Sequence, residues 1–376
     1  MPTAIASARS RFPGRARVVC RALLARLASG GRRSRPFDPE RILIAHHLLL
    51  GDTLMLTALV AKLRERHPAA DIVMALPEAY APLYTGAPYG LRAIGWRPLE
   101  PAASPLWAES GFDLALVPGD NRMSWLALAL DARWIVAFAG DRPPTKNWPI
   151  DELWHYPEVP AAWSDMVAGL VEGPPPAAFR PEHWPAPAAA PILERSGPYA
   201  VLHVGASTPL KRWNPARWTA LAARFAAQGI EPIWSAGPLE KSLVRACDPE
   251  ARHRSLAGTT SLAQLWHVLA GAAVLVSPDT GIAHLGRVVG VPTVALFGPG
   301  SAALSGAGAF WREAPYRAVT VDPFPCRDQR VLFGREIAWL RRCGRTLDQC
   351  AHPRCMDAVE LDAVTAAVRS LGVSLG

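Results

Sequence analysis

The stretch VLVSPDTGIAHLGRVVG, residues 274–290, carries the pattern that decides the fold class. An apolar run of strand length at 273–277 leads within a few residues into 281–289, where apolar side chains recur at helical spacing. A strand that leads directly into a helix is the repeating unit of a parallel sheet with helices on its faces. The stretch therefore predicts an α/β fold with parallel strands.

The same alternation continues through the rest of the chain in both directions. Apolar runs of strand length precede amphipathic segments of helix length, and turns rich in Gly and Pro separate them. The expected strands are 41–49, 71–76, 112–118, 134–138, 199–204, 231–235, 273–277 and 293–297. The expected helices are 53–66, 261–269, 281–289, 361–371 and one that Asn214 caps and Pro215 opens.

A chain of 376 residues is long enough for two domains, and its composition indicates where they divide. Residues 173–198 are rich in Pro and Ala and cannot sustain a helix or a central strand, so we expect a linker there. The expected parts are a basic arm 1–37, a Rossmann-like domain 38–172, the linker, and a second Rossmann-like domain 199–376 that ends in a Cys-containing tail and a helix. Ligands of such folds bind at the carboxyl ends of the strands, so we expect a site in the cleft between the two sheets.

The formal net charge of +8 is concentrated in the arm. Nine arginines precede the first acidic residue, Asp38: Arg9, Arg11, Arg15, Arg17, Arg21, Arg26, Arg32, Arg33 and Arg35. One apolar helical face is expected from Val18, Val19, Ala22, Leu23, Leu24 and Leu27, and it suits an anionic membrane surface. The alternatives are a disordered solvated tail, or a segment for organellar targeting or nucleic-acid contact. No apolar run reaches the roughly 18 to 20 residues of a membrane span, so we do not expect an integral membrane protein.

Small polar residues and cations follow the expected strand 199–204, just before the helix that Asn214 caps. Ser207, Thr208, Lys211 and the backbone N–H groups of this turn predict a diphosphate site, because charge-assisted hydrogen bonds to a multiply charged group are strong. The alternative is an ordinary turn with a solvated lysine.

Four further candidates lie where the strand 273–277 meets its helix: Asp279, Thr280, Gly281 and His284. A helix N-terminus favours negative charge, Gly281 lets a bulky ligand approach the backbone, and His284 lies one turn along the helix from Thr280. These residues predict a second part of the anion site. Capping of the helix by Asp279 and a structural, hydrogen-bonded His284 are the alternatives.

Gly51 and Asp52 follow the first expected strand and carry the only carboxylate at that junction. Asp52 is a candidate general base for a hydroxyl group, and helix capping is the alternative. His46 and His47 offer a rival base, although a histidine within a buried strand more often has a structural role.

Together these motifs resemble glycosyltransferase family 9, the lipopolysaccharide heptosyltransferases, from residue 41 to the C-terminus. The matching motifs are, in order, Gly51-Asp52, then Gly205-Ala206-Ser207 with Lys211 and Trp213, then Asp279-Thr280-Gly281 with His284, and finally Phe297-Gly298-Pro299. Each motif alone is weak, but four in order at the family's spacing are a specific signal.

The resemblance implies a GT-B fold of two facing Rossmann-like domains, with the acceptor on the N-terminal side and the nucleotide sugar on the C-terminal side. It implies inverting transfer of a sugar, heptose from ADP-heptose, to a hydroxyl of a glycan or glycolipid in lipopolysaccharide or related cell-surface glycan synthesis. No cofactor, metal or nucleic-acid partner is expected. The expected location is cytoplasmic, with peripheral contact at the inner membrane through the arm. Carried over by position, Asp52 is the base, Ser207, Thr208 and Lys211 hold the diphosphate, Glu240 contacts the donor ribose, and Asp279, Thr280, Gly281 and His284 complete the donor site.

One departure from the family pattern concerns the strand before Asp52. The family usually has an Arg six residues before the catalytic Asp and a small hydroxyl residue between them, whereas this chain has His46 and the run Leu48-Leu49-Leu50. If that Arg contacts an acidic acceptor, the acceptor differs here. Two alternative functions stay open, a non-catalytic binder of sugar nucleotides and a GT-B nucleotide-sugar epimerase. A dinucleotide oxidoreductase is disfavoured, because no G-x-G-x-x-G follows the first strand of either half.

Six cysteines are present, and four lie near the C-terminus: Cys326, Cys343, Cys350 and Cys355. Their spacing lacks the C-x2-C pairs typical of zinc and iron–sulfur sites. We therefore expect free thiols, with a metal site that includes His352 as the alternative.

Overall fold

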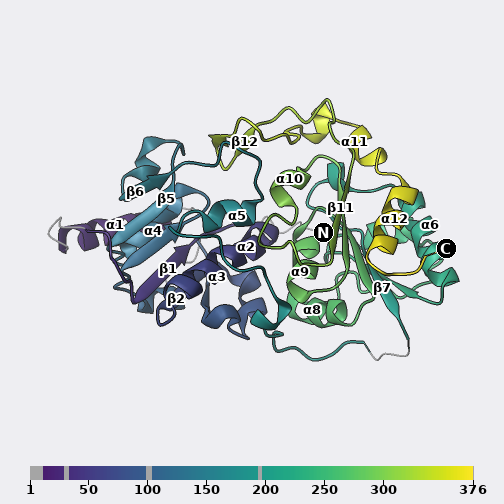
Figure 1. Ribbon diagram of the computed structural model, residues 1–376, viewed down its shortest axis with the longest axis horizontal. Coiled ribbons are helices and arrows are strands. Elements are labelled where there is room, and N and C mark those ends of the chain that lie inside the picture. Colours follow the sequence, from purple (N-terminus) through teal and green to yellow (C-terminus); the bar gives the residue numbers. More distant parts are fainter. Residues whose placement is uncertain (1–11, 29–33, 99–103, 194–196, 376) are drawn as a thin grey trace, which may run out of the picture.

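The computed structural model describes residues 12–28, 34–98, 104–193 and 197–375. Within these residues, the strands form two larger parallel sheets, ordered β3-β2-β1-β4-β5-β6 and β11-β10-β9-β7-β8, and one small hairpin of β12 and β13. Figure 1 shows the two sheets side by side, each with its own helices, the N-terminal half in purple to blue and the C-terminal half mainly in green. The predicted α/β class with two parallel sheets is confirmed.

The N-terminal half is built around β1, whose last four residues are fully buried because helices cover both faces of the sheet. Its strands are β1 (Arg41–Ala45), β2 (Asp71–Pro77), β3 (Arg92–Trp96), β4 (Leu114–Val117), β5 (Trp134–Phe138) and β6 (Glu152–Trp154). Its helices after the arm are α2 (Leu50–Met55), α3 (Thr57–Arg66), α4 (Ser124–Ala129) and α5 (Trp163–Ala168).

The first strand is shorter than expected, and the following helix begins earlier. β1 ends at Ala45, and α2 already starts at Leu50. The chain leaves the sheet at His46, where the Leu48 N–H donates to Nδ1 of His46 at 3.2 Å. Asp52 therefore lies in the first turn of a helix and not in a loop at the end of a strand.

The C-terminal half agrees more closely with the expected elements. Its strands are β7 (Tyr199–His203), β8 (Glu231–Ser235), β9 (Val274–Pro278), β10 (Thr293–Phe297) and β11 (Tyr316–Thr320). Its helices are α6 (Pro215–Ala227), α7 (Lys241–Cys247), α8 (Leu262–Ala270), α9 (Gly281–Val289), α10 (Ala302–Ser305), α11 (Arg354–Asp357) and α12 (Leu361–Ser370). The Asn214 side chain caps α6 and Pro215 occupies its first position, as predicted.

The Pro-rich segment 173–198 contacts both halves of the molecule. The Phe179 N–H donates to the Phe310 carbonyl at 2.9 Å, and the Trp184 indole N–H donates to the Leu83 carbonyl at 3.2 Å. The Trp184 ring also packs against Trp266, with centroids 5.8 Å apart. Aromatic side chains thus fix this segment along the side of the molecule.

Residues 12–28 of the arm form a helix, α1 (Phe12–Ala28), which packs on α4. Ala22 is fully buried in this contact, whereas Leu24 and Leu27 are 65% and 78% exposed. The arginines Arg9, Arg11, Arg32 and Arg33 lie outside the described residues. Among the residues that are described, no helix is long and apolar enough to span a membrane.

A segment of the C-terminal half crosses to the N-terminal half and returns. This segment, residues 326–345, is called the strap, and it contains the hairpin of β12 (Val331–Leu332) and β13 (Arg335–Glu336). Its side chains Leu332, Ile337 and Leu340 are buried in the same apolar cluster as residues of the N-terminal half. Figure 1 shows β12 above α5, far from β7. The sequence predicts this segment only as part of the C-terminal domain, because its contacts depend on tertiary packing that no local pattern indicates.

Candidate active site

The two halves meet where the first turns of α2 and α9 contact each other. A Cβ atom on Gly281 would lie 2.8 Å from Cβ of Leu50, and one on Gly51 would lie 2.7 Å from Cδ2 of His284. Glycine is required at both positions because any side chain would push the helices apart. Leu50 of the N-terminal half is thus a close neighbour of Gly281.

Asp52 lies at this junction, half-buried in the first turn of α2. Burial, together with the nearby Asp279 carboxylate, raises the pKa of Asp52 to about 6, although Lys211 and Arg342 oppose the rise. A carboxylate with such a pKa is largely ionised at neutral pH and is a stronger base than an ordinary aspartate, which suits a general base.

Lys211 and Asp279 form an ion pair across from Asp52. The Lys211 ammonium donates to the Asp279 backbone carbonyl at 2.8 Å and to its carboxylate at 2.9 Å. Asp279 does not cap α9, because the Thr280 hydroxyl accepts from the Ile282 N–H instead. A Cβ on Gly300 would lie 2.3 Å from the Asp279 carboxylate, so the loop after β10 also contacts this pair.

The turn after β7 brings the remaining predicted diphosphate residues to the same edge of the sheet. Thr208 caps the short helical turn Pro209–Lys211, and its hydroxyl accepts from the Leu210 N–H at 3.4 Å. Ser207 is exposed on this turn. The structure thus places Ser207 and Thr208 on the turn that carries Lys211.

Glu240 binds backbone groups of two turns. Its carboxylate accepts from the Ala206 N–H and from the Gly237 N–H, each at 2.9 Å. A Cβ on Gly205 would lie 2.2 Å from this carboxylate, which explains why glycine precedes Ala206. Glu240 therefore joins the turns that follow β7 and β8, next to the turn of Lys211.

His284 is buried on α9 and is held by an arginine one turn further along the helix. Its Nδ1 accepts a hydrogen bond from Nη2 of Arg287. Burial and the charges of Arg287 and Lys211 hold the pKa of His284 well below its usual value. The ring is therefore neutral at physiological pH.

His46, one of the two histidines that offer a rival base, is a poor base because of its surroundings. It is 1% exposed, burial lowers its pKa to about 3, and its Nδ1 already accepts from the Leu48 N–H. A histidine with so low a pKa is a poor proton acceptor from a hydroxyl group. Asp52 is thus the better basic group at the end of β1.

The comparisons with known proteins agree with this geometry. A family model for glycosyltransferase family 9 (heptosyltransferase) matches residues 110–310, more than half of the chain. The chain belongs to glycosyltransferase family 9. Lipopolysaccharide heptosyltransferase 1 of Pseudomonas aeruginosa is 33% identical over 147 residues, which are 36% of this chain and 41% of that protein. The same enzyme of Salmonella typhimurium is 32% identical over 113 residues, and the match spans 35% of its length. The matches thus cover well under half of these two relatives.

Solved structures with the same fold include two heptosyltransferases of E. coli. ADP-heptose lipopolysaccharide heptosyltransferase II of E. coli has a TM-score of 0.63 at 18% identity, and the match covers 89% of this chain and 100% of that one. The E. coli heptosyltransferase WaaC with ADP has a TM-score of 0.57 at 20% identity, covering 69% of this chain and 88% of that one. The expected GT-B architecture is confirmed.

Two charged residues at the candidate site were not among the predicted residues. Arg342 of the strap acts electrostatically on Asp52, and Arg287 binds His284. Arg287 could have been suspected from its spacing, because residues three apart on a helix are neighbours. No local sequence pattern indicates a role for Arg342. It is 290 residues from Asp52 in the sequence and approaches it only because the strap crosses to the N-terminal half.

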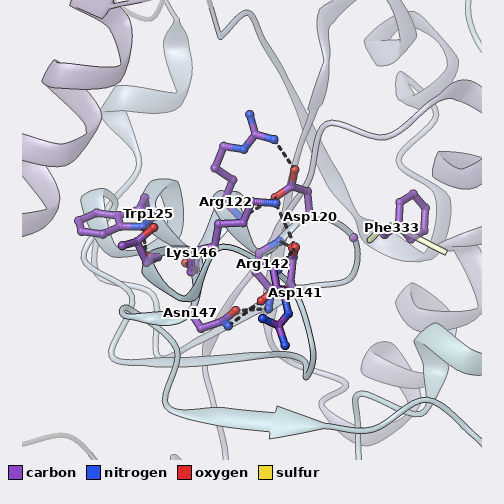
Figure 2. A network of polar contacts seen from close by, with 12 residues as sticks. Asp120, Arg122, Trp125, Asp141, Arg142, Lys146, Asn147 and Phe333 are labelled. Atoms are coloured by element: carbon purple, nitrogen blue, oxygen red, sulfur yellow. Dashed lines mark hydrogen bonds and ion pairs between the residues drawn. The ribbon is translucent and has the colours of Figure 1, made fainter. Parts of the chain in front are cut away.

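The carboxyl ends of β4 and β5 carry a polar network on the N-terminal side of the family 9 fold. Figure 2 shows Lys146 between Asp120 and Asp141, and its ammonium lies 3.0 Å from a carboxylate oxygen of each. Asp141 also accepts from the Asn121 N–H at 2.8 Å and pairs with Arg335 of the strap at 3.6 Å. The network fixes the loops that face the strap.

The four C-terminal cysteines are free, and the other three act electrostatically on Cys355. Burial, followed by the charge of Cys326, raises the pKa of Cys355 to about 11, with smaller contributions from Cys343 and Cys350. Within the described residues, no group of three or more His, Cys, Asp or Glu side chains is arranged to hold a metal ion.

Proposed function

We propose that this family 9 protein is an inverting glycosyltransferase that uses its own side chains, without a metal, to move a sugar from a nucleotide diphosphate to an acceptor hydroxyl. The observation that carries the proposal is the arrangement of Asp52 on α2 and the Lys211–Asp279 pair beside α9, on opposite sides of one interdomain contact. A base and a cationic diphosphate site are the two groups that such a transfer needs.

The chemistry divides between these two sides. Asp52 removes the proton of the acceptor hydroxyl, and the oxygen forms a bond to the anomeric carbon on the face opposite the diphosphate. The bond from that carbon to the diphosphate breaks, and the nucleoside diphosphate leaves with the electron pair. The leaving group gains negative charge, which Lys211 and the N-terminal N–H groups of α9 stabilise.

The donor assignment rests on the C-terminal half. Ser207, Thr208 and Lys211 are proposed to bind the diphosphate, Glu240 the ribose, and Asp279, Thr280, Gly281 and His284 to complete the donor site. For Glu240 to bind a ribose hydroxyl, it must use lone pairs that the two backbone N–H groups leave available. ADP-heptose is the proposed donor, because E. coli WaaC, which shares the fold, has been solved with ADP-2-deoxy-2-fluoro heptose.

The acceptor is proposed to be a glycan or glycolipid of the cell surface, and the site of action the cytoplasmic face of the inner membrane. α1 supports membrane contact, because Leu23, Leu24 and Leu27 are exposed beside arginines. An exposed apolar face next to cations suits the interface of an anionic bilayer.

Calorimetry on the wild type and two variants tests the proposal. We expect ADP-heptose to bind, in preference to UDP-sugars and GDP-sugars, and Lys211→Ala to weaken that binding about tenfold or more. Asp52→Asn should leave donor binding intact and abolish transfer. If no sugar nucleotide binds, or if Lys211→Ala changes nothing, the donor site is wrong.

The two alternative functions give different results in the same assay. A non-catalytic binder would bind the donor and transfer nothing to any acceptor. An epimerase would convert the donor sugar without an acceptor. Product analysis after incubation with donor alone separates epimerisation from transfer.

A further inference from the structure

A buried arginine lies directly behind the candidate donor site. Arg287 is 1% exposed, and its guanidinium donates to the Gly306 carbonyl at 2.6 Å, to the Ser305 carbonyl at 2.9 Å, and to Nδ1 of His284. The guanidinium also lies 4.5 Å from the centre of the Tyr316 ring. Among the described residues, no carboxylate lies within ion-pair distance of it, although the Asp279 carboxylate acts on it electrostatically.

Such an arrangement is energetically costly. A guanidinium loses its favourable hydration when it is buried, and carbonyl and ring contacts recover only part of that loss. A leucine or methionine would fill the same space without the penalty. The guanidinium acts on two residues of the proposed donor site, electrostatically on Asp279 and by a hydrogen bond on His284.

The chemistry of this contact fixes the state of the imidazole. Arginine only donates hydrogen bonds, so Nδ1 of His284 must present a lone pair. The neutral ring then carries its hydrogen on Nε2. The adjacent cation also opposes a second proton on the ring, because two positive charges would stand side by side.

The hydrogen on Nε2 faces the interdomain junction. A Cβ on Gly51 would lie 3.2 Å from Nε2 and 2.7 Å from Cδ2 of His284. This edge of the ring thus lies against the first turn of α2, one residue before Asp52. Lys211 is the other charged group that acts on the ring, and the Asp52 and Asp279 carboxylates are the nearby acidic groups of the two packed segments.

We infer that Arg287 is a positioning residue that keeps His284 neutral and protonated on Nε2, so that His284 donates a hydrogen bond to a substrate oxygen beside Asp52. The ligand atom is a phosphate or sugar oxygen of the donor, and the inference rests on the proposed function. His284 is then neither an acid nor a base in the reaction. Its role is a fixed donor whose orientation does not change with pH.

Nitrogen NMR of protein with 15N-labelled histidine tests the predicted tautomer of His284 without any substrate. In the wild type, we expect the His284 signals, assigned by their loss in His284→Asn, to show the Nε2–H tautomer from about pH 6 to about pH 8. In Arg287→Met, the ring should populate the other tautomer or become protonated within that range. An unchanged tautomer in Arg287→Met would overturn the inference.

Two further variants keep the test decisive if Arg287→Met does not fold. Arg287→Gln keeps one N–H donor for Nδ1 and should restore the Nε2–H tautomer in a folded protein if Arg287→Met does not fold. Arg312→Met is the matched control, because Arg312 is an exposed arginine after the same loop, where it donates to the Ala309 carbonyl and lies 3.8 Å from the Glu313 carboxylate. It should leave the His284 signals unchanged.

Kinetics then separates a positioning role from a structural one. We expect Arg287→Met to lower kcat/KM about tenfold or more, and to cause no further loss in a His284→Asn background, because both changes remove the same hydrogen bond. Independent, multiplicative losses in the double variant would contradict the inference. If no transfer is found for the wild type, the proposed function fails, whereas the NMR result still decides the state of His284.

Discussion

Asp52 owes its proposed role to charges that come from three separate parts of the chain. Burial and Asp279 raise its pKa to about 6, and Lys211 and Arg342 keep it from rising further. Asp279 and Lys211 belong to the C-terminal half, and Arg342 belongs to the strap. The reactivity of this one carboxyl group therefore depends on the assembled molecule.

The first prediction concerns the base itself. Asp52→Asn keeps the size of the side chain and removes its ability to accept a proton, so transfer should fall by about 100-fold to 10,000-fold. Donor affinity, measured by calorimetry, should change little. Full transfer activity in Asp52→Asn would exclude Asp52 as the base.

The second prediction concerns pH. A base must be deprotonated, so kcat/KM should be constant above the pKa of Asp52 and fall as the pH drops through about 6. Arg342 lowers this pKa, so Arg342→Gln should move the acidic limb of the profile to higher pH. Arg341→Gln, a change at the exposed neighbour, is the control and should leave the limb in place. If the acidic limb of the pH profile also stays in place in Arg342→Gln, the strap does not affect the pKa of Asp52.

Several site residues were predictable because local sequence marks them. Asp279, Thr280 and Gly281 stand at a junction of strand and helix that periodicity alone locates, and Lys211 precedes a capped helix. The partner of Asp279 was not predictable. The alternative role for Asp279, capping of α9, belongs to Thr280. The Asp279 carboxylate pairs with Lys211 because the turns after β7 and β9 lie next to each other.

At the scale of elements, the sequence predicted the C-terminal half better than the N-terminal half. β8 and β10 have the expected bounds because Gly and Pro in the adjoining turns delimit them. The bounds of β1 and α2 differ from the expected ones because the apolar run Leu48-Leu49-Leu50 is compatible with either a strand or a helix. In the structure, the Leu48 N–H donates to the His46 ring and not to a neighbouring strand.

The third prediction concerns α1. The double change Leu24→Glu and Leu27→Glu should abolish binding to vesicles that contain phosphatidylglycerol, because charge on this face opposes its burial in the membrane interface. Wild-type binding should be weaker at high salt and on phosphatidylcholine alone. Leu239→Glu, at a leucine that is 96% exposed on the other half, is the control for added charge. Vesicle flotation that does not differ between the α1 variant and the wild type would argue against this contact.

The fourth prediction concerns the strap. Arg335 is 3% exposed and donates to the carbonyls of Gly119 and Ala139, at 3.0 and 2.9 Å. Arg335→Met leaves these groups and Asn121 without this donor, so the free energy of unfolding should fall by about 3 kcal/mol. Urea unfolding measures this, with Arg330→Met as an exposed control in the same segment. A loss no larger than that of Arg330→Met would mean that the strap is held by its apolar side chains alone.

At the scale of the whole molecule, two connections join the halves on different sides. The segment 173–198 binds both halves through Phe179 and Trp184. The strap binds the N-terminal half through Arg335 and through the Trp339 indole N–H, which donates to the Pro157 carbonyl. α2 and α9 meet between these two connections, with glycine at the point of contact. Their first turns are thereby held in a fixed relation.

The path of the strap also sets an order for biosynthesis. The N-terminal sheet is complete once Trp154 has left the ribosome, but the carbonyls of Gly119 and Ala139 receive their partner only when Arg335 has been made. Domains generally fold as units while the chain grows, with the N-terminal one first. Here the contacts between that first unit and the strap can form only after nearly all of the chain has been translated.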